Sequence, residues 1–160
     1  MGAEVYFFRG ISESDMLREL TIGKSAYCLV EMPMSTWTDS MYRELAHIYT
    51  NQGIVPIVAH VDRYFTRFRT FGIPQKLEKL PVLIQANASF FSRGSSARAM
   101  RMLRKEQIHL LGSDCHNMRS RQPNLGKAVE KIQAHAGIEM LERMMEFQSN
   151  VLGDNLDSET

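Results

Sequence analysis

The sequence predicts an α/β fold in which a parallel sheet is covered by crossover helices. Short apolar, β-branched runs alternate along the chain with longer segments whose apolar residues recur at helical spacing. The residues just after these runs are polar and regularly spaced: Glu31, His60, Asn87 and Asp114 are 29, 27 and 27 positions apart. In α/β barrels the carboxyl ends of the strands carry the chemistry, so we expect these four side chains to gather on one rim.

Four apolar runs are predicted to be strands: residues 26–30, 54–59, 82–86 and 108–111. The first is continuous and bounded by polar residues, which suits a strand buried on both faces. The second contains Pro56 near its start, where a missing N–H costs least. A step of 27 residues back from Glu31 leads to Glu4, but the sequence shows no strand before it.

The segments between these runs are predicted to be helical. Ser12 is a polar cap with Asp15 three residues on, so a helix of about three turns is expected from there toward Gly23. A second helix should run from residue 38 to 52, with Gly53 as a left-handed stop. The remaining helices are expected at 74–79, 95–106, 125–136 and from 138 to about 151, with an irregular loop over 112–123.

The length allows one domain. The 160 residues are 44% hydrophobic, which is enough for a single core, and we expect a domain over 1–152 with a polar tail over 153–160. At about 27 residues per βα unit the chain supplies about five and a half units, whereas a closed barrel needs about seven or eight strands. The chain is therefore expected to begin part-way through a barrel, and an open barrel edge would favour strand exchange or a homo-oligomer.

Composition excludes several classes of function. The formal charge of +1 gives no basic field for non-specific nucleic-acid binding. The sequence has no long apolar span and no signal peptide, so we expect a soluble, cytoplasmic protein without membrane insertion. Two cysteines, Cys28 and Cys115, form no CxxC pair and fit a reducing compartment. No P-loop, dinucleotide-binding fingerprint or nucleophile elbow is present, and neither cysteine lies in a phosphate loop.

Residues 114–116, with the sequence Asp-Cys-His, form the sharpest local feature. Side chains two apart point the same way at a strand end, so Asp114 and His116 could reach one metal ion, with Cys115 packing behind. The alternative is a turn aspartate beside a surface histidine. Taken singly, His60 is more simply a core histidine, whereas Glu31 needs a partner if it is buried. Their shared position at strand ends favours a site, and such ligands suit manganese, iron or zinc in a multinuclear hydrolytic centre.

Arginines form a second group of candidates. Arg63 and Arg121 each lie in a loop that leaves a candidate strand end, where two guanidinium groups could clamp a phosphate. Solvated loop charge is the alternative for either one. The other arginines considered are interpreted as solvated surface charge: Arg67, Arg69, Arg98, Arg101 and Arg104.

Five segments together resemble a known family. Residues 57–64 (IVAHVDRY) resemble [IV]-[IV]-A-H-P-E-R-Y, and residues 112–117 (GSDCHN) resemble [AG]-S-D-A-H-N, with Arg-Gln-Pro at 121–123 where the family has R-P-P. Residues 2–5, 29–33 and 84–88 resemble its G-x-E-[IV], [LI]-[IV]-E-[FLM]-P and Q-[IL]-N-A segments. On these segments the chain is identified as a member of the PHP (polymerase and histidinol phosphatase) superfamily, among the manganese-dependent tyrosine-protein phosphatases of bacterial capsular and exopolysaccharide operons.

The resemblance implies a distorted (β/α)7 TIM-like barrel, incomplete at its N-terminus, with several Mn²⁺ ions. It implies that a metal-activated hydroxide hydrolyses phosphotyrosine on a bacterial tyrosine autokinase. Arg63 and Arg121 would then bind the phosphate. The metal ligands that it implies are Glu4, Glu31, His60, Asp114 and His116.

The chain also departs from the family pattern. The N-terminal H-x-H pair is absent, Asp62 replaces a glutamate, and Gln122 replaces a proline. Five of about eight ligands remain, so we expect weak or no activity from this chain alone. Two alternatives stay open: another PHP phosphoesterase of the histidinol-phosphate type, or a catalytically inactive remnant that binds a phosphoprotein.

Overall fold

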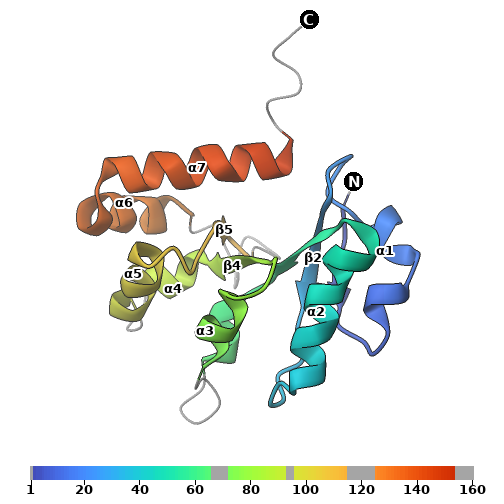
Figure 1. Cartoon of the computed structure of the whole chain (residues 1–160). Helices are drawn as coiled ribbons and strands as arrows, with labels where there is room; N and C mark the ends of the chain where they lie inside the picture. The colour runs from blue at the N-terminus through green and yellow to red at the C-terminus, as the bar shows by residue number, and fades with distance from the viewer. Residues whose placement is uncertain (1, 66–71, 93–95, 115–124, 154–160) are drawn as a thin grey trace, which may run out of the picture.

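The computed structural model describes residues 2–65, 72–92, 96–114 and 125–153. They form an α/β fold around a five-stranded parallel sheet with the strand order β1-β2-β3-β4-β5 (Figure 1). The strands are β1 (Glu4–Tyr6), β2 (Tyr27–Glu31), β3 (Val55–Val58), β4 (Leu83–Asn87) and β5 (Leu110–Gly112). The helices are α1 (Met16–Glu19), α2 (Asp39–Gln52), α3 (Ile73–Leu77), α4 (Ala88–Ser92), α5 (Ser96–Arg104), α6 (Leu125–Ala136) and α7 (Ile138–Leu152), with 3-10 turns η1 (Ile11–Glu13) and η2 (Val61–Tyr64).

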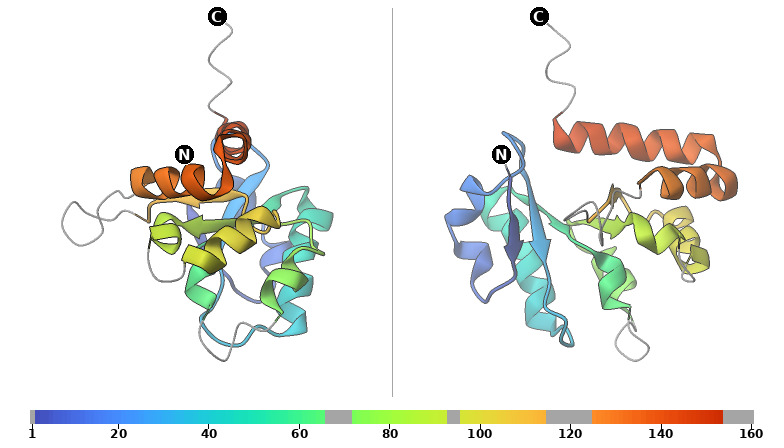
Figure 2. Two further views of the ribbon diagram at one scale, coloured as in Figure 1. Left: turned by 90° about the vertical axis from the view of Figure 1, so that its left-hand side faces the viewer. Right: turned by 180° about the vertical axis from the view of Figure 1, so that it is seen from behind.

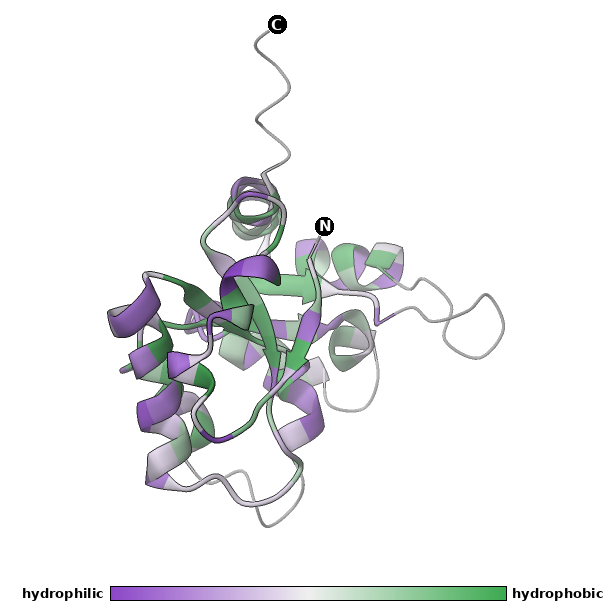
Figure 3. Ribbon diagram, turned by 90° about the vertical axis from the view of Figure 1, so that its right-hand side faces the viewer, coloured by the Kyte–Doolittle hydropathy of each residue, from purple (hydrophilic) through white to green (hydrophobic). Residues whose placement is uncertain are grey.

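The two faces of the sheet carry apolar clusters of very different size. The larger core lies between the sheet and the crossover helices, and contains Leu45 of α2, Leu103 of α5 and Ile132 of α6. The smaller one joins Ile57 and Leu110 of the sheet to Val151 of α7. Figure 2 shows α7 and α6 stacked at one end of the molecule, and the strands are mostly apolar along their length (Figure 3).

The predicted α/β class and parallel sheet are confirmed, and so are most of the elements. The helix over 38–52 forms as α2 and ends at Gly53, whose φ of 69° is the expected left-handed stop. The predicted strands form with their ends shifted by one or two residues, because helix and strand ends depend on tertiary hydrogen bonds that periodicity does not report. The short helix α4 and the turn η2 carry no sequence periodicity and were not predicted.

Two predictions about the first half of the chain were wrong. The three-turn helix after Ser12 is replaced by η1 and the single turn α1, because Ser14 is extended and separates them. Among the described residues no strand precedes Glu4, as expected, but β1 begins at this residue and pairs with β2 in the register Glu4↔Leu29. Strand β2 is not buried on both faces, since Cys28 and Val30 are buried but Leu29 on the other face is only half-buried.

Helix length and hydropathy test the expectation about membranes. Within the described ranges, no helix is both long enough and apolar enough to cross a bilayer.

Candidate functional site

Two of the predicted rim residues have a left-handed backbone conformation. His60 (φ 50°) follows β3 and caps η2, and Asp114 (φ 49°) follows β5. Among the described non-glycine residues, only Glu106 shares a positive φ. Such a conformation costs free energy in an L-residue and is concentrated at functional sites. Both turns are therefore places where the fold holds a side chain in a required position.

The imidazole of His60 contacts side chains from β1, from β4 and from the residue region just after β5. Its Nδ1 is 2.9 Å from Oδ1 of Asn87, at the end of β4, and its Nε2 is 3.1 Å from Oε1 of Glu4, in β1. The Nε2 atom is also 4.0 Å from Oδ1 of Asp114. His60 is buried, so these contacts bring two carboxylates, an amide and an imidazole together at one edge of the sheet.

A third carboxylate orients the Asn87 amide and so fixes which ring nitrogen of neutral His60 carries the proton. Asp62 accepts hydrogen bonds from the backbone N–H of Asn87 at 2.8 Å and from its Nδ2 at 3.2 Å. Because Nδ2 must face this carboxylate, Oδ1 of Asn87 faces His60 and accepts from Nδ1–H. In neutral His60 the lone pair is then on Nε2, between Glu4 and Asp114, where a metal ion could accept it.

Arg63 links the two carboxylates on either side of β3. Its Nη1 donates to Oε1 of Glu31 at 3.0 Å and its Nη2 donates to Oδ2 of Asp114 at 2.6 Å. Partial burial lowers the pKa of Arg63, but the hydrogen bond to Asp114 and the charges of Glu31 and Glu4 outweigh it, and the pKa is raised overall. The guanidinium is therefore charged at neutral pH, and three of its five N–H donors remain for a ligand.

Gln85 of β4 holds the backbone of His60. Its Oε1 accepts from the His60 backbone N–H at 2.6 Å, and its Nε2 donates to the carbonyl of Ala86 at 3.0 Å. Gly112 makes room for this side chain, since a Cβ at that position would lie 2.2 Å from Gln85 Nε2. The left-handed turn at His60 thus depends on a close approach between β4 and β5.

An aromatic cluster supports the segment that carries Arg63. The buried hydroxyl of Tyr64 accepts a hydrogen bond from the backbone N–H of Met32 at 2.9 Å, and burial raises the pKa of this phenol. The ring of Trp37 packs edge-on against that of Tyr64, with centroids 4.9 Å apart. Trp37 also donates to the carbonyl of Pro33 at 3.0 Å. These contacts fix η2 relative to the chain that leaves β2.

The rim borders a cavity on the face of the sheet that packs against α7. Its volume is about 250 Å³, its floor is apolar, and His60 and Asp114 lie in its wall. The described acidic side chains of the rim outnumber its cations, because Arg63 is the one described guanidinium beside four carboxylates: Glu4, Glu31, Asp62 and Asp114. Clustered carboxylates repel one another, so this donor set of carboxylate oxygens and one imidazole nitrogen fits a divalent cation.

The described residues do not by themselves form a complete metal site. In these four ranges, no three or more His, Cys, Asp or Glu side chains are grouped so that they could hold an ion. Arg63 lies between Glu31 and Asp114 and takes part of their acceptor capacity. Cys28 offers no alternative nucleophile, because burial raises the pKa of its thiol to about 11.

The structure brings together five of the seven residues singled out from the sequence: Glu4, Glu31, His60, Arg63 and Asp114. The other two, His116 and Arg121, lie outside the described residues, and so do Cys115, Arg67 and Arg69.

Two residues that position His60 were missed as such. The sequence does not indicate the role of Gln85, because a single amide within an apolar run shows neither a partner nor a function. Asn87 does carry one, since it is a member of the 27-residue series, but no role follows from the spacing alone.

The chain matches a known protein family and resembles proteins of known function. Residues 1–152 match the family model described as capsular polysaccharide synthesis, CpsB/CapC. The tyrosine-protein phosphatase CpsB of Streptococcus pneumoniae is 28% identical over 141 residues, and the match covers 82% of this chain and 58% of the relative. CpsB of Streptococcus agalactiae serotype III (strain NEM316) is 25% identical over the same shares. The chain thus spans less than two thirds of the length of these relatives.

The fold has a close counterpart among solved structures. The crystal structures of YwqE from Bacillus subtilis and CpsB from Streptococcus pneumoniae, described as unique metal-dependent tyrosine phosphatases, include a chain that superposes with a TM-score of 0.82 at 19% identity. The match covers 96% of this chain and 64% of that one. At this identity the likeness establishes the fold.

Proposed function

The chain belongs to the CpsB/CapC capsular polysaccharide synthesis family, and from this premise we propose that it is a metal-dependent protein-tyrosine phosphatase module. The observation that carries the proposal is the contact of His60 with Glu4 and Asn87, beside the bridge from Arg63 to Glu31 and Asp114. Such a site suits hydrolysis of a phosphate ester better than binding alone, because it combines carboxylates and an imidazole that can bind a metal ion with a guanidinium that can bind a phosphate.

We propose these roles for individual residues. Glu4, Glu31, His60, Asp114 and His116 hold Mn²⁺, with iron or zinc as substitutes. A bound metal ion supplies a Lewis acid that polarises the phosphate and lowers the pKa of water. Arg63 and Arg121 bind the phosphate, and Asn87 keeps Nε2 of His60 available by accepting from Nδ1–H.

We also propose a domain and a barrel architecture to which the five-stranded sheet belongs. We propose a single domain over 1–152, with its five strands as part of a distorted (β/α)7 TIM-like barrel and with 153–160 as a tail. The described sheet ends at β1 and β5, so strand pairing through these edges is a proposed route to a homo-oligomer. Part of the β5 edge is already used, because Leu111 N–H donates to Gln148 of α7 at 2.8 Å.

The proposed substrate is phosphotyrosine on a bacterial tyrosine autokinase of capsular or exopolysaccharide synthesis, in the cytoplasm. The family match and the tyrosine-phosphatase relatives favour this substrate over histidinol phosphate. Nucleic acid is not a proposed ligand, since the net charge is close to zero.

The test is phosphate release from a phosphotyrosine peptide with Mn²⁺ and with a chelator. We compare the chain with Asp114→Asn and with the control Glu142→Gln, an exposed carboxylate of α7. Turnover that needs metal, survives in Glu142→Gln and falls at least about 100-fold in Asp114→Asn supports the proposal. Absence of turnover from the folded chain with Mn²⁺ would contradict it and would favour a phosphoprotein-binding remnant.

A further inference from the structure

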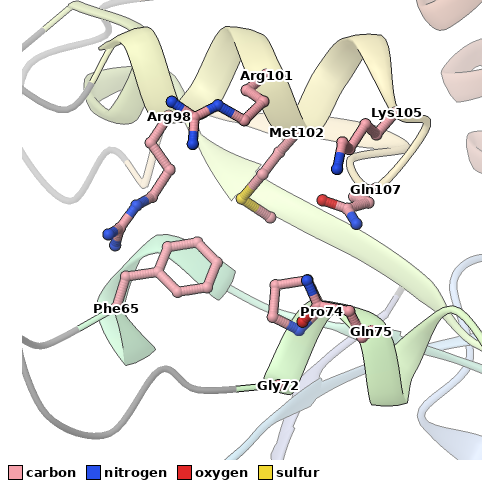
Figure 4. A pocket seen from close by; sticks show the side chains of 9 residues that line it. All are labelled: Phe65, Gly72, Pro74, Gln75, Arg98, Arg101, Met102, Lys105 and Gln107. Carbon is pink, nitrogen blue, oxygen red and sulfur yellow. The ribbon is translucent and has the colours of Figure 1, made fainter.

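A basic groove lies between α3 and α5, outside the site described above (Figure 4). Its volume is about 590 Å³. The α5 side contributes Arg98, Arg101 and Lys105, and the α3 side contributes Pro74 and Gln75. The residues on which the inference depends are Arg98, Arg101, Lys105, Phe65, Pro74 and Met102.

The cations of this groove are arranged for an external anion. Arg98 and Arg101 lie on one face of α5, and Lys105, the residue just after the helix, continues that face at a spacing of four, with its N–H bonded to the Arg101 carbonyl. Arg101 and Lys105 are exposed and form no ion pair with another described residue, and no carboxylate is among the described residues that line the groove. Arg104 differs, because it donates to the His135 carbonyl of the neighbouring helix.

The apolar part of the groove favours a peptide over a nucleic acid. Pro74 and Met102 are buried residues at its floor, where an aliphatic side chain could rest. Single-stranded nucleic acids need aromatic rings on which bases stack. The one aromatic ring among the described lining residues, Phe65, is already covered by Arg98, whose guanidinium carbon lies 5.6 Å from the ring centroid.

The groove begins next to the phosphatase site. Phe65 is the residue after η2, the turn that carries Arg63. We propose that the groove binds an acidic segment of the protein whose phosphotyrosine is hydrolysed, and so selects phosphotyrosines that have acidic neighbours. This inference rests on the proposed function for its link to turnover, but its binding step can be measured independently.

The binding test uses fluorescence anisotropy with a labelled, unphosphorylated peptide rich in Asp and Glu, and a second peptide in which Asn and Gln replace them. We expect the acidic peptide to bind at least about tenfold more tightly, and added NaCl to weaken its binding. The variant Arg101→Glu/Lys105→Glu should weaken binding about tenfold or more. The control Lys24→Glu reverses an exposed charge just before the start of β2 and should change the peptide affinity less than about twofold.

Three results would overturn the inference. They are equal binding of the two peptides, unchanged binding in Arg101→Glu/Lys105→Glu, and tighter binding of a single-stranded oligonucleotide through the same cations. Arg101→Gln/Lys105→Gln, which adds no negative charge, should weaken binding in the same direction and so guards against a folding defect.

Turnover separates this inference from the proposed function. With phosphotyrosine peptides of the two compositions, the groove variant should raise KM for the acidic peptide without lowering kcat. If the chain shows no turnover with either peptide, the proposed phosphatase activity fails, and the anisotropy result alone decides whether the groove binds acidic segments.

Discussion

Arg63 at the rim and the cations of the groove between α3 and α5 are similar in chemistry and opposite in surroundings. Arg63 is held by two carboxylates within 3.0 Å and lies in an acidic neighbourhood. Arg101 and Lys105 are exposed, and the described residues that line their groove include no acidic side chain. A paired guanidinium has a fixed position and direction, whereas an exposed cation can follow the charge of a partner.

This difference separates two tasks. The rim provides few, precisely directed donors beside metal-type ligands, which suits chemistry on one phosphate group. The groove provides several exposed charges along a helix, which suits selection of a longer anionic segment. Variants of the rim should therefore change turnover without changing peptide binding, and variants of the groove should do the reverse.

The largest effect is expected from removal of the rim guanidinium. Arg63→Ala should lower kcat for a phosphotyrosine peptide by about 100- to 1000-fold, because phosphate charge loses a directed donor. Arg63→Lys should recover little of this activity. Arginine bonds Glu31 and Asp114 through two nitrogens of one planar group, which a lysine ammonium lacks. Steady-state kinetics measure this effect. Binding of the acidic peptide, measured by anisotropy, should be unchanged. A parallel loss of binding would show that the rim and the groove do not have separate tasks.

A smaller effect is expected from Asn87, which accepts from His60 without reaching the phosphate. Asn87→Ala frees Nδ1 and leaves Asp62 without its side-chain partner, so Mn²⁺ affinity should fall about 10- to 100-fold. Calorimetric titration of Mn²⁺ measures this change. Recovery of kcat at high Mn²⁺ would agree with a positioning role, and a loss that Mn²⁺ cannot restore would contradict it.

Gly112 tests the support beneath the rim. In Gly112→Ala the new Cβ displaces the Gln85 amide, which breaks its bonds to His60 and Ala86. The free energy of unfolding should fall by about 1–3 kcal/mol, measured in urea. Gly126→Ala is the matched control, because nothing lies within 4 Å of its added Cβ in α6, and it should be neutral or slightly stabilising. Equal effects in both variants would argue against the contact.

The smallest effect is expected from His109, which belongs to neither region. Burial lowers the pKa of His109, partly opposed by Glu106, and its Nδ1 accepts from Ile84 N–H at 3.0 Å. The unfolded chain therefore binds the proton first as pH falls below about 6.5, and stability is lost between that pH and the lower folded pKa. Thermal melts between pH 7.5 and 5.5 should show less pH dependence in His109→Gln. An unchanged slope would remove His109 as the cause.

The sequence predicts the sheet and the rim better than the details that hold them. The parallel order and most strands follow from apolar runs, and the 27-residue spacing finds Glu31, His60 and Asp114. Hydrogen bonds that depend on strand register, such as Gln85 to His60, leave no local pattern. Helix α5 shows the same limit, because periodicity treats Arg101 and Arg104 alike, and only the tertiary structure separates Arg101, at the groove, from Arg104, bonded to α6.

Direct measurement of Mn²⁺ binding tests most sharply whether the rim is a metal site. Calorimetry on the chain should show binding that weakens at least about tenfold in His60→Asn, since asparagine tolerates the left-handed backbone but lacks the imidazole. Glu142→Gln should bind as the unmodified chain does. Equal affinity in the chain and in His60→Asn, or no binding by the folded chain, would contradict the assignment of the rim as a metal centre.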